Sequence, residues 1–305
     1  MLNPLTIPLS EEQLNAYRTD GFLLIKNALP QEILDEAWRL YDPWLNGIMD
    51  EWREQGLLSG SVEGKTSGEQ FLDAWKKSGK PMFRRRPFKN LINEDAYHFL
   101  RSQVFLDLAT QLLGTPEISM HGVYNARSQP PNCDWATPPF HQDAHFWNAE
   151  VGIEDSDPEV HVVTMWFPLH PVNETTGCLQ MISQAECGYE MFERAKVEFE
   201  TTGYVGMRPE EAAKYKHHPM RMEQGDVLAF NQKTPHRASP NTADRIRYSY
   251  DLRYEATEGA TPVGDKYGFI AQSLTDPGSV TPVEEWIKKR DAYLAWFDQT
   301  GGVKK

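Results

Sequence analysis

The sequence predicts a mainly β core with flanking helices. Beyond Gly114, short runs rich in Val, Ile, Phe, Tyr and Trp are separated by Pro, Gly and Asn, as in an all-β sandwich or barrel. The preceding part instead carries apolar residues at helical spacing. No repeat or linker divides the chain, so we expect residues 1–305 to form one domain with helices on one side of the β core. Its parts would be a mostly helical segment at 1–114, the core at 115–256, and an extension containing a helix at 257–305.

A capped helix and a short strand are predicted first. Ser10 can cap a helix whose third residue, Gln13, completes a capping box, and Gly21 ends that helix. The apolar run at 22–25 follows between Gly21 and Asn27. This run is too short for a helix and predicts a buried strand.

Two further helices are predicted before the β core. The first follows Pro30 and keeps helical spacing until Pro43, which we expect to interrupt or kink it. The second runs from about Glu94 to Leu113 with one apolar face. Between them, residues 53–68 carry four glycines among polar residues. That composition predicts a loop, and we consider it as a lid over the site.

The core is predicted from runs of β-forming residues bounded by turn residues, enough for a small barrel or a two-sheet roll. The candidate strands lie near residues 118–127, 139–147, 161–172, 178–183, 217–223, 226–231 and 246–255. Beyond them, an apolar set among charged residues predicts a final helix from about Val283 to Phe297.

Charge and composition exclude several classes of function. The chain has 31 Lys and Arg against 44 Asp and Glu, a net charge of -13, and such a surface repels phosphate backbones and anionic lipid. No apolar run approaches the roughly 20 residues that span a bilayer, and the first residues lack the order of a signal peptide. We therefore expect a soluble cytoplasmic protein that acts on a small molecule, without nucleic-acid or membrane partners.

The three cysteines, Cys133, Cys178 and Cys187, are odd in number and irregularly spaced. This argues against a disulfide framework and against a Cys-rich zinc site. A metal would then need histidine and carboxylate ligands.

One short stretch offers such ligands. His141 and Asp143 are two residues apart and share a face if the segment is extended. Two histidines and one carboxylate form the facial triad of non-haem Fe(II) enzymes, so a third ligand would have to come from elsewhere. The alternative for such a pair is an ordinary hydrogen bond on or near the surface. His145 shares the predicted face and is either a pocket residue or a packed histidine.

A zinc-protease motif is the competing interpretation, because His141 and His145 are four residues apart. That motif needs Glu after the first histidine, and this chain has Gln142. The paired prolines before His141 also fit a helix poorly.

Polar residues alternate along the strand at 246–255. Arg247, Ser249, Asp251 and Arg253 share one face, and an arginine with a hydroxyl two residues on can hold a small carboxylate. The alternative is that this face is in solvent and the intervening Tyr248, Tyr250 and Leu252 face the core.

Taken in order, these residues resemble the phytanoyl-CoA dioxygenase family of Fe(II)- and 2-oxoglutarate-dependent oxygenases. The resemblance covers about residues 10–255, including an opening helix and strand at 17–25 and a central hairpin at 173–179. The residues that carry it are His141-x-Asp143, the strand from Gly225 to Phe230, His236, Asn241 five residues on, and Arg247 eleven residues on.

The resemblance implies a double-stranded β-helix core of the jelly-roll, cupin-like kind. It also implies that His141, Asp143 and His236 bind Fe(II), and that Arg247 holds the distal carboxylate of 2-oxoglutarate with Ser249 as a helper. The expected reaction consumes O2, releases succinate and CO2, and hydroxylates an unactivated C–H bond, with desaturation or ring formation as alternatives. Aspartate at position 143 argues against halogenation, for which the family has a small residue there.

Five residues are candidates for lining a substrate pocket, four on predicted neighbouring strands and Trp147 flanking the strand of His141, although side chains such as Tyr124 and Trp147 are more often core residues. They are Tyr124, Asn125, Arg127, Trp147 and Thr164. The only dense basic cluster, Arg84–Arg86, could receive an anion or lie in solvent.

Two rival functions remain open from the sequence. One is a non-catalytic β-barrel protein that binds a small molecule, and the intact ligand set speaks against it. The other is a zinc- or manganese-dependent cupin-like hydrolase or isomerase, which would not require Arg247.

Overall fold

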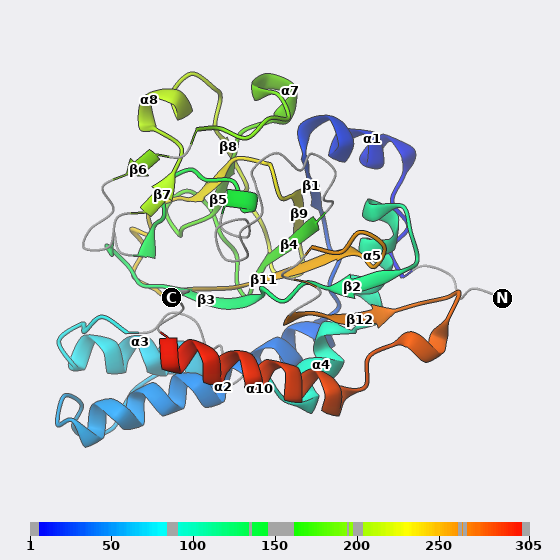
Figure 1. Cartoon of the computed structure of the whole chain (residues 1–305). Coiled ribbons are helices and arrows are strands. Elements are labelled where there is room, and N and C mark those ends of the chain that lie inside the picture. The colour runs from blue at the N-terminus through cyan, green and yellow to red at the C-terminus, as the bar shows by residue number, and fades with distance from the viewer. Residues whose placement is uncertain are drawn as a thin grey trace.

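In the computed structural model, the described part of the chain folds into a seven-stranded sheet, a three-stranded sheet, a small hairpin and a layer of helices (Figure 1). The structure describes residues 6–83, 91–133, 136–145, 162–193, 195–197, 204–261, 264 and 267–300. The larger sheet has the order β1 (Phe22–Ile25), β9 (Val227–Asn231), β4 (Val162–Pro168), β11 (Arg247–Ala256), β2 (Ile118–Met120) and β12 (Phe269–Gln272), with β3 (Asn125–Gln129) also paired to β11. The smaller sheet has the order β10 (His236–Ala238), β5 (Leu179–Met181) and β8 (His218–Pro219). A separate hairpin joins β6 (Ala195–Val197) and β7 (Tyr204–Gly206).

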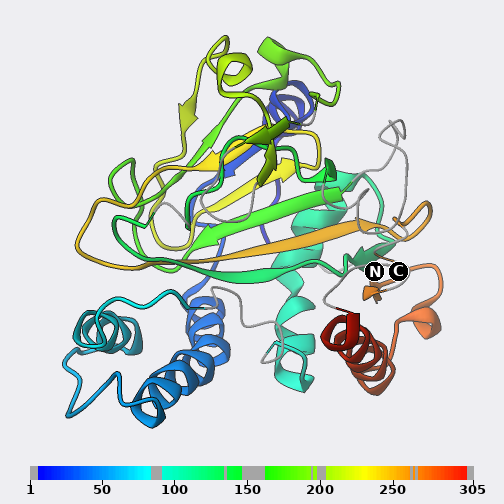
Figure 2. The same ribbon diagram turned by 60° about the vertical axis from the view of Figure 1, so that its left-hand side comes forward.

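Helices cover one face of the larger sheet, and Figures 1 and 2 place α2, α3, α4 and α10 together below it. The helices are α1 (Glu11–Asp20), α2 (Gln31–Glu54), α3 (Ser67–Lys77), α4 (Glu94–Leu100), α5 (Gln103–Leu113) and α10 (Val283–Thr300). Two single turns, α7 (Gln184–Cys187) and α8 (Pro209–Ala212), lie on the other side of the sheet, and a 3-10 turn, η2 (Pro277–Ser279), precedes α10. The prediction of a mainly β fold with flanking helices is confirmed.

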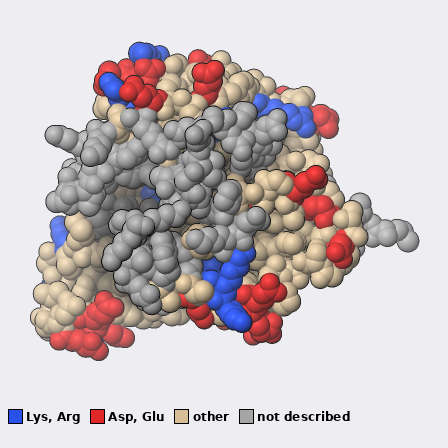
Figure 3. Space-filling view, viewed as in Figure 1, with Lys and Arg blue, Asp and Glu red and all other residues tan. Residues whose placement is uncertain are grey.

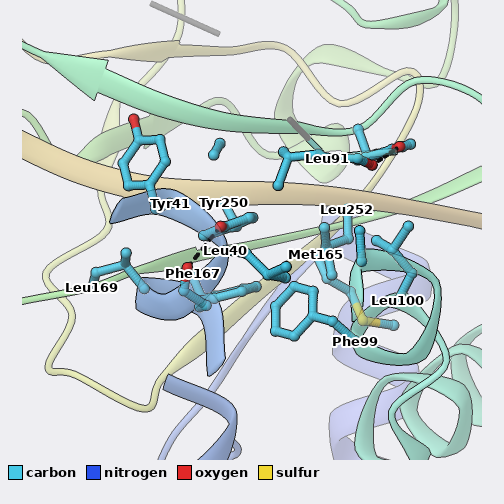
Figure 4. Close-up of a cluster of buried hydrophobic side chains, with 14 of the residues drawn as sticks. Leu40, Tyr41, Leu91, Phe99, Leu100, Met165, Phe167, Leu169, Tyr250 and Leu252 are labelled. Atoms are coloured by element: carbon cyan, nitrogen blue, oxygen red, sulfur yellow. Dashed lines mark hydrogen bonds between the residues drawn. The ribbon is translucent and has the colours of Figure 1, made fainter. Parts of the chain in front are cut away.

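The central strands β4 and β11 of the larger sheet are buried on both faces. Every residue of β4 is buried, as are all residues of β11 except the last. On the helix side, Phe167 and Tyr250 stack with ring centroids 5.5 Å apart, and Phe99 of α4 lies 5.5 Å from Tyr250 (Figure 4). This side forms the large apolar core.

The opposite face of the larger sheet packs on the smaller sheet. Trp166 of β4 and Phe230 of β9 belong to a second apolar cluster with Leu179 and Met181 of β5. The space between the two sheets is therefore closed by apolar side chains at this end.

The capping prediction at the amino terminus is confirmed. The side chain of Ser10 accepts from the backbone N–H of Gln13, the Gln13 side chain accepts from the backbone N–H of Ser10, and Gly21 ends α1 in the left-handed conformation at φ 80°. The predicted strand at 22–25 is β1.

The end of α2 and the extent of the predicted loop at 53–68 differ from the sequence predictions. Pro43 lies inside α2, which continues to Glu54 because buried residues such as Trp44 and Ile48 extend its apolar face past the proline. The predicted loop at 53–68 is shorter, because α3 begins at Ser67 and is capped by Thr66. That helix was not predicted, since its glycine at the second position resembles loop sequence.

The helix predicted from Glu94 to Leu113 is two helices. The helical conformation is interrupted at Arg101 and Ser102, and both resulting helices bury their apolar residues. The strand predicted at 118–127 is likewise two strands, β2 and β3. An apolar spacing shared by α4 and α5 hides the break between the two helices in the sequence.

The segment at 139–147 is not a strand where it is described. Only His141 makes an isolated bridge, and residues 144–145 turn into helical conformation. The short strands β10 and β12 were not predicted, because three or four residues are too few for a periodic pattern.

Charged residues gather in small groups of both signs on the face shown in Figure 3, where Lys and Arg lie beside Asp and Glu. None of the described helices is long and apolar enough to span a membrane. Arg84–Arg86 and Trp147 lie outside the described residues.

Candidate metal centre

Two histidines from distant parts of the chain face each other across a backbone bridge. The N–H of His141 donates to the carbonyl of His236 at 3.0 Å, and the N–H of His236 donates to the carbonyl of His141 at 2.9 Å. This pairing brings the two ring centroids to 4.3 Å. The short strand β10 thus positions one histidine and the segment after Pro139 positions the other.

Each histidine is oriented by a carbonyl two residues earlier. Nδ1 of His141 lies 2.9 Å from the carbonyl of Pro139, and Nδ1 of His236 lies 3.0 Å from that of Thr234. A carbonyl can only accept, so each Nδ1 carries the proton. The lone pair on each Nε2 is then available to a metal.

Asp143 completes the group. Its Oδ1 lies 3.8 Å from Nε2 of His141 and 3.8 Å from Nε2 of His236. The ligand atoms of the three residues all lie within 4.8 Å of one another, and all three residues are buried. The backbone N–H of Ala144, which donates to the carbonyl of Gln232 at 3.0 Å, fixes the turn that carries Asp143.

The ionisation states suit a divalent metal. Burial lowers the pKa of His141 to about 3 and also lowers the pKa of His236, so both rings are neutral at pH 7. Burial opposes ionisation of Asp143, but the adjacent Arg253 outweighs it and holds the pKa of that carboxyl below its usual range. Two neutral imidazoles and one carboxylate are the donor set of a non-haem Fe(II) site, so the residues present fit that metal.

Arg253 of β11 donates hydrogen bonds to Oδ2, the second carboxylate oxygen of Asp143. Its Nε and Nη2 donate to Oδ2 at 3.0 and 2.7 Å. Thr164, the cross-strand partner of Arg253 on β4, places its hydroxyl 3.4 Å from the same oxygen.

A second carboxylate, that of Asp251, lies on the other side of the Arg253 guanidinium. Asp251 accepts from Nη1 of Arg253 at 2.7 Å and from the amide of Asn125 at 3.0 Å. Arg127 donates to both oxygens of Asp251, at 2.8 and 2.9 Å. Asn125 and Arg127 belong to β3, whose register on β11 sets Asn125 opposite Asp251.

The arginine predicted to hold a cosubstrate lies at the other end of the same strand pair. Nη1 of Arg247 donates to the hydroxyl of Ser249 at 2.5 Å. Its Nε and Nη2 donate to Oε1 of Gln129 at 3.1 and 2.8 Å, and the guanidinium lies 5.5 Å from the ring centroid of Trp166. The odd-numbered face of β11 is therefore buried between the sheets, and the even-numbered face packs on the helices.

The structure places the predicted pocket residues in different surroundings. Thr164, Asn125 and Arg127 belong to the polar group beside Asp143. Tyr124 packs in the large apolar core and donates its hydroxyl to the carbonyl of Leu91 at 2.6 Å. His145 is buried but is not among the grouped ligand atoms.

Sequence reasoning assigned no function to Gln129, Arg253 or Trp166. The alternation along β11 placed Arg253 on the correct face, but its partner on another segment had no signal in the sequence. Gln129 acquires its contact with Arg247 from the register of β3 on β11, where the two residues are directly opposite.

Residues 17–249 match the model of a family described as phytanoyl-CoA dioxygenase. No curated protein matches the chain significantly.

Several solved structures share the fold. A protein described as a non-heme monooxygenase, ThoJ in complex with Ni, has 16% identity and a TM-score of 0.58, covering 95% of this chain and 98% of its own. EvdO2 from Micromonospora carbonacea var. aurantiaca, complexed with 2-oxoglutarate, has 16% identity and a TM-score of 0.53, with coverage of 82% and 92%. AviO1 from Streptomyces viridochromogenes Tue57 has 16% identity and a TM-score of 0.53, with coverage of 84% and 99%. At this identity the likeness establishes the fold.

Proposed function

The chain belongs to the phytanoyl-CoA dioxygenase family of 2-oxoglutarate-dependent non-haem iron oxygenases, and we propose that it hydroxylates an unactivated C–H bond of a small molecule. The reaction consumes O2 and 2-oxoglutarate and releases succinate and CO2. Desaturation or ring formation by the same centre are the alternative outcomes.

One observation carries this proposal. His141, Asp143 and His236 converge as a buried group with the protonation states that a divalent metal requires. A non-catalytic binding protein would have no need of three converging, deprotonated ligands inside its fold.

We assign the metal to these three residues and the distal carboxylate of 2-oxoglutarate to Arg247. The guanidinium of Arg247 is oriented by Gln129 and Ser249, so its planar fork is fixed before a carboxylate arrives. When bound, iron and 2-oxoglutarate supply the oxidant, while the protein determines which C–H bond of the substrate faces it.

The two sheets support a double-stranded β-helix as the core. The larger sheet faces β10, β5 and β8, and the bridge between His141 and His236 extends the smaller sheet by one segment. In this arrangement the metal ligands lie at the edge of the smaller sheet and Arg247 lies on the larger one.

Anaerobic addition of Fe(II) and 2-oxoglutarate tests the assignment. We expect a weak visible charge-transfer band in the folded protein, and succinate production once O2 is admitted. His236→Ala should abolish both, because the metal loses one of its three protein ligands.

His98→Ala is the matched control, since the His98 side chain is 61% exposed on α4 and should leave the band unchanged. A folded wild-type protein without the band would contradict the proposed function. Retained succinate production in His236→Ala would remove that residue from the metal site.

A further inference from the structure

The carboxylate of Asp143 has two oxygens in different surroundings. Oδ1 faces Nε2 of both histidines at 3.8 Å. Oδ2 accepts two N–H groups of Arg253, at 3.0 and 2.7 Å. Charge-assisted bonds of this length are the stronger hydrogen bonds of proteins, so one oxygen is held while the other points at the candidate metal position.

Arg253 is itself held from behind. Its Nη1 donates to Oδ2 of Asp251 at 2.7 Å and to the carbonyl of Val123 at 3.3 Å. A guanidinium with all three of its nitrogens engaged has a fixed plane and cannot rotate away from Asp143. The Arg253 side chain is only 3% exposed, so water does not screen these contacts.

Asp251 connects this contact to a third charged residue. It accepts from Arg127 through both oxygens at 2.8 and 2.9 Å, and the Arg127 side chain is 25% exposed. Along the series Arg127, Asp251, Arg253 and Asp143, charges alternate in sign from the partly exposed end to the metal ligand. Alternation offsets the cost of burying Asp251, Arg253 and Asp143, because each one lies against an opposite charge.

We infer that Arg253 is a positioning residue that keeps Asp143 a one-oxygen metal ligand, with Asp251 holding Arg253 in place. The inference rests on the proposed metal role of Asp143. A carboxylate can bind a metal through one oxygen or both. With Oδ2 engaged by Arg253, only Oδ1 remains for the metal, and the position that Oδ2 would have taken stays open for cosubstrate or O2.

Anaerobic Co(II) binding to the full chain tests this role without turnover. Co(II) is the probe, and the readouts are its dissociation constant and its visible absorption. In Arg253→Met we expect the dissociation constant to rise by roughly 10- to 100-fold, the usual effect of losing a partner that orients a metal ligand. The visible absorption should also change, because a released Oδ2 alters the coordination of the metal. Arg253→Lys, which keeps the charge but not the fork, should restore only part of the affinity.

Asp251→Asn provides a second variant. It is needed because removing Arg253 takes away a positive charge that the buried carboxylates of Asp143 and Asp251 share, and the protein could then fail to fold. This change keeps the shape of the side chain and removes the charge that holds both Arg253 and Arg127. We expect a smaller loss of Co(II) affinity with unchanged circular dichroism. Arg101→Met is the matched control: Arg101 bonds to the carbonyl of Ala271 away from the site, so Co(II) affinity should not change.

The outcomes separate the two proposals. If the wild-type protein does not bind Co(II), the proposed metal site is wrong. If the wild-type protein binds it, but folded Arg253→Met and Asp251→Asn keep its affinity and absorption, only the positioning role of Arg253 is wrong. Should Arg253→Met fail to fold, Arg253→Lys and Asp251→Asn decide by the same criteria.

Discussion

Gln129 fixes the direction of Arg247 through a single oxygen atom. Two nitrogens of the guanidinium donate to Oε1 of Gln129, while the amide nitrogen of Gln129 donates to the carbonyl of Ser239 at 2.9 Å. The glutamine is 1% exposed, so its orientation is set by the protein alone. An arginine held in this way loses little conformational entropy when it binds a carboxylate.

Replacing Gln129 by Ala should therefore weaken 2-oxoglutarate binding. We expect a rise of about 10-fold in the dissociation constant for 2-oxoglutarate, which corresponds to one lost hydrogen-bonding partner of a charged group. Anaerobic titration of the metal-loaded protein measures it.

Gln180→Ala is the control for that prediction. Gln180 accepts from Nε of Arg237 at 2.7 Å on the smaller sheet, so the same change removes a similar contact outside the candidate cosubstrate position. Equal effects of the two substitutions would contradict a specific role for Gln129.

Recognition of the candidate ligands from the sequence was possible because residue types and their order along the chain are visible without a fold. His141 and Asp143 are two residues apart, and His236 and Arg247 follow in a fixed order. The structure brings the first three together. Their roles as metal ligands stay predictions until a metal is bound and measured.

At the scale of elements, β11 is tied to the helices by tyrosine hydroxyls. Tyr250 donates to the carbonyl of Ala37 in α2 at 2.8 Å, and Tyr254 donates to the carbonyl of Leu100 in α4 at 2.7 Å. The same strand carries Arg247 and Arg253 on its other face. Helix packing and site geometry therefore depend on one strand.

Tyr250→Phe should lower the free energy of unfolding by about 1 kcal/mol, because it removes one buried hydrogen bond and leaves the ring in place. Urea unfolding measures this change. Tyr189→Phe is the control, since Tyr189 is 54% exposed and its hydroxyl can exchange its partner for water. A Tyr250→Phe protein as stable as the wild type would show that this hydroxyl does not hold the sheet to α2.

His170, which follows the end of β4, makes the stability of the folded protein depend on pH. Its Nε2 can accept from the backbone N–H of Tyr248 at 3.1 Å. Burial, with the nearby charge of Arg245, lowers the pKa of His170 to about 4 from its usual value near 6.5. Between these two values the unfolded chain binds a proton that the folded protein does not, so stability falls as the pH falls from about 6.5 to about 4.

His170→Gln should flatten this dependence in the metal-free protein. The slope of the free energy of unfolding against pH should decrease by at most about 1.4 kcal/mol per pH unit, the value for one proton. Urea unfolding between pH 4 and 7 measures it for the wild type and the variant. His98→Gln, at an exposed histidine, should leave the slope unchanged, and an equal slope in His170→Gln would contradict the prediction.

Element prediction succeeded where the signal was local and failed where it depended on distant partners. The capping box of α1 lies within four residues, so Ser10, Gln13 and Gly21 predicted both ends of the helix. The break between α4 and α5 has no such signal, because both helices keep an apolar face that packs on the sheet.

At the scale of the whole molecule, the carboxy-terminal extension belongs to the main core. Trp286 of α10 is fully buried, with its ring 5.8 Å from Tyr97 and 5.2 Å from Phe269. The buried Arg290, also on α10, donates to the carbonyl of Gly122 at 2.7 Å. We therefore expect the extension to unfold together with the β core.

Trp286→Ala should destabilise the whole protein by about 3–5 kcal/mol, the usual cost of removing a buried aromatic side chain. Calorimetry should show one cooperative transition that moves to lower temperature. Leu274→Ala, at a residue in the same extension that is 47% exposed, should move it little. A separate early transition for the extension would contradict a single domain.

The sequence by itself determined the chemistry that this protein has available. The shortage of cysteines left histidine and carboxylate as ligands, and the order of His141, Asp143, His236 and Arg247 indicated the family. These features are visible without a fold because residue type and order are properties of the chain itself.

Only the tertiary structure decided which face of β11 is interior and what its charges contact. Alternation placed Arg247 and Arg253 on one face, but because both faces are buried, the pattern could not tell solvent from core. The contacts of Arg253 with Asp143 and of Arg127 with Asp251 join segments more than 100 residues apart. Such contacts follow from strand register and burial, which are properties of the assembled sheets.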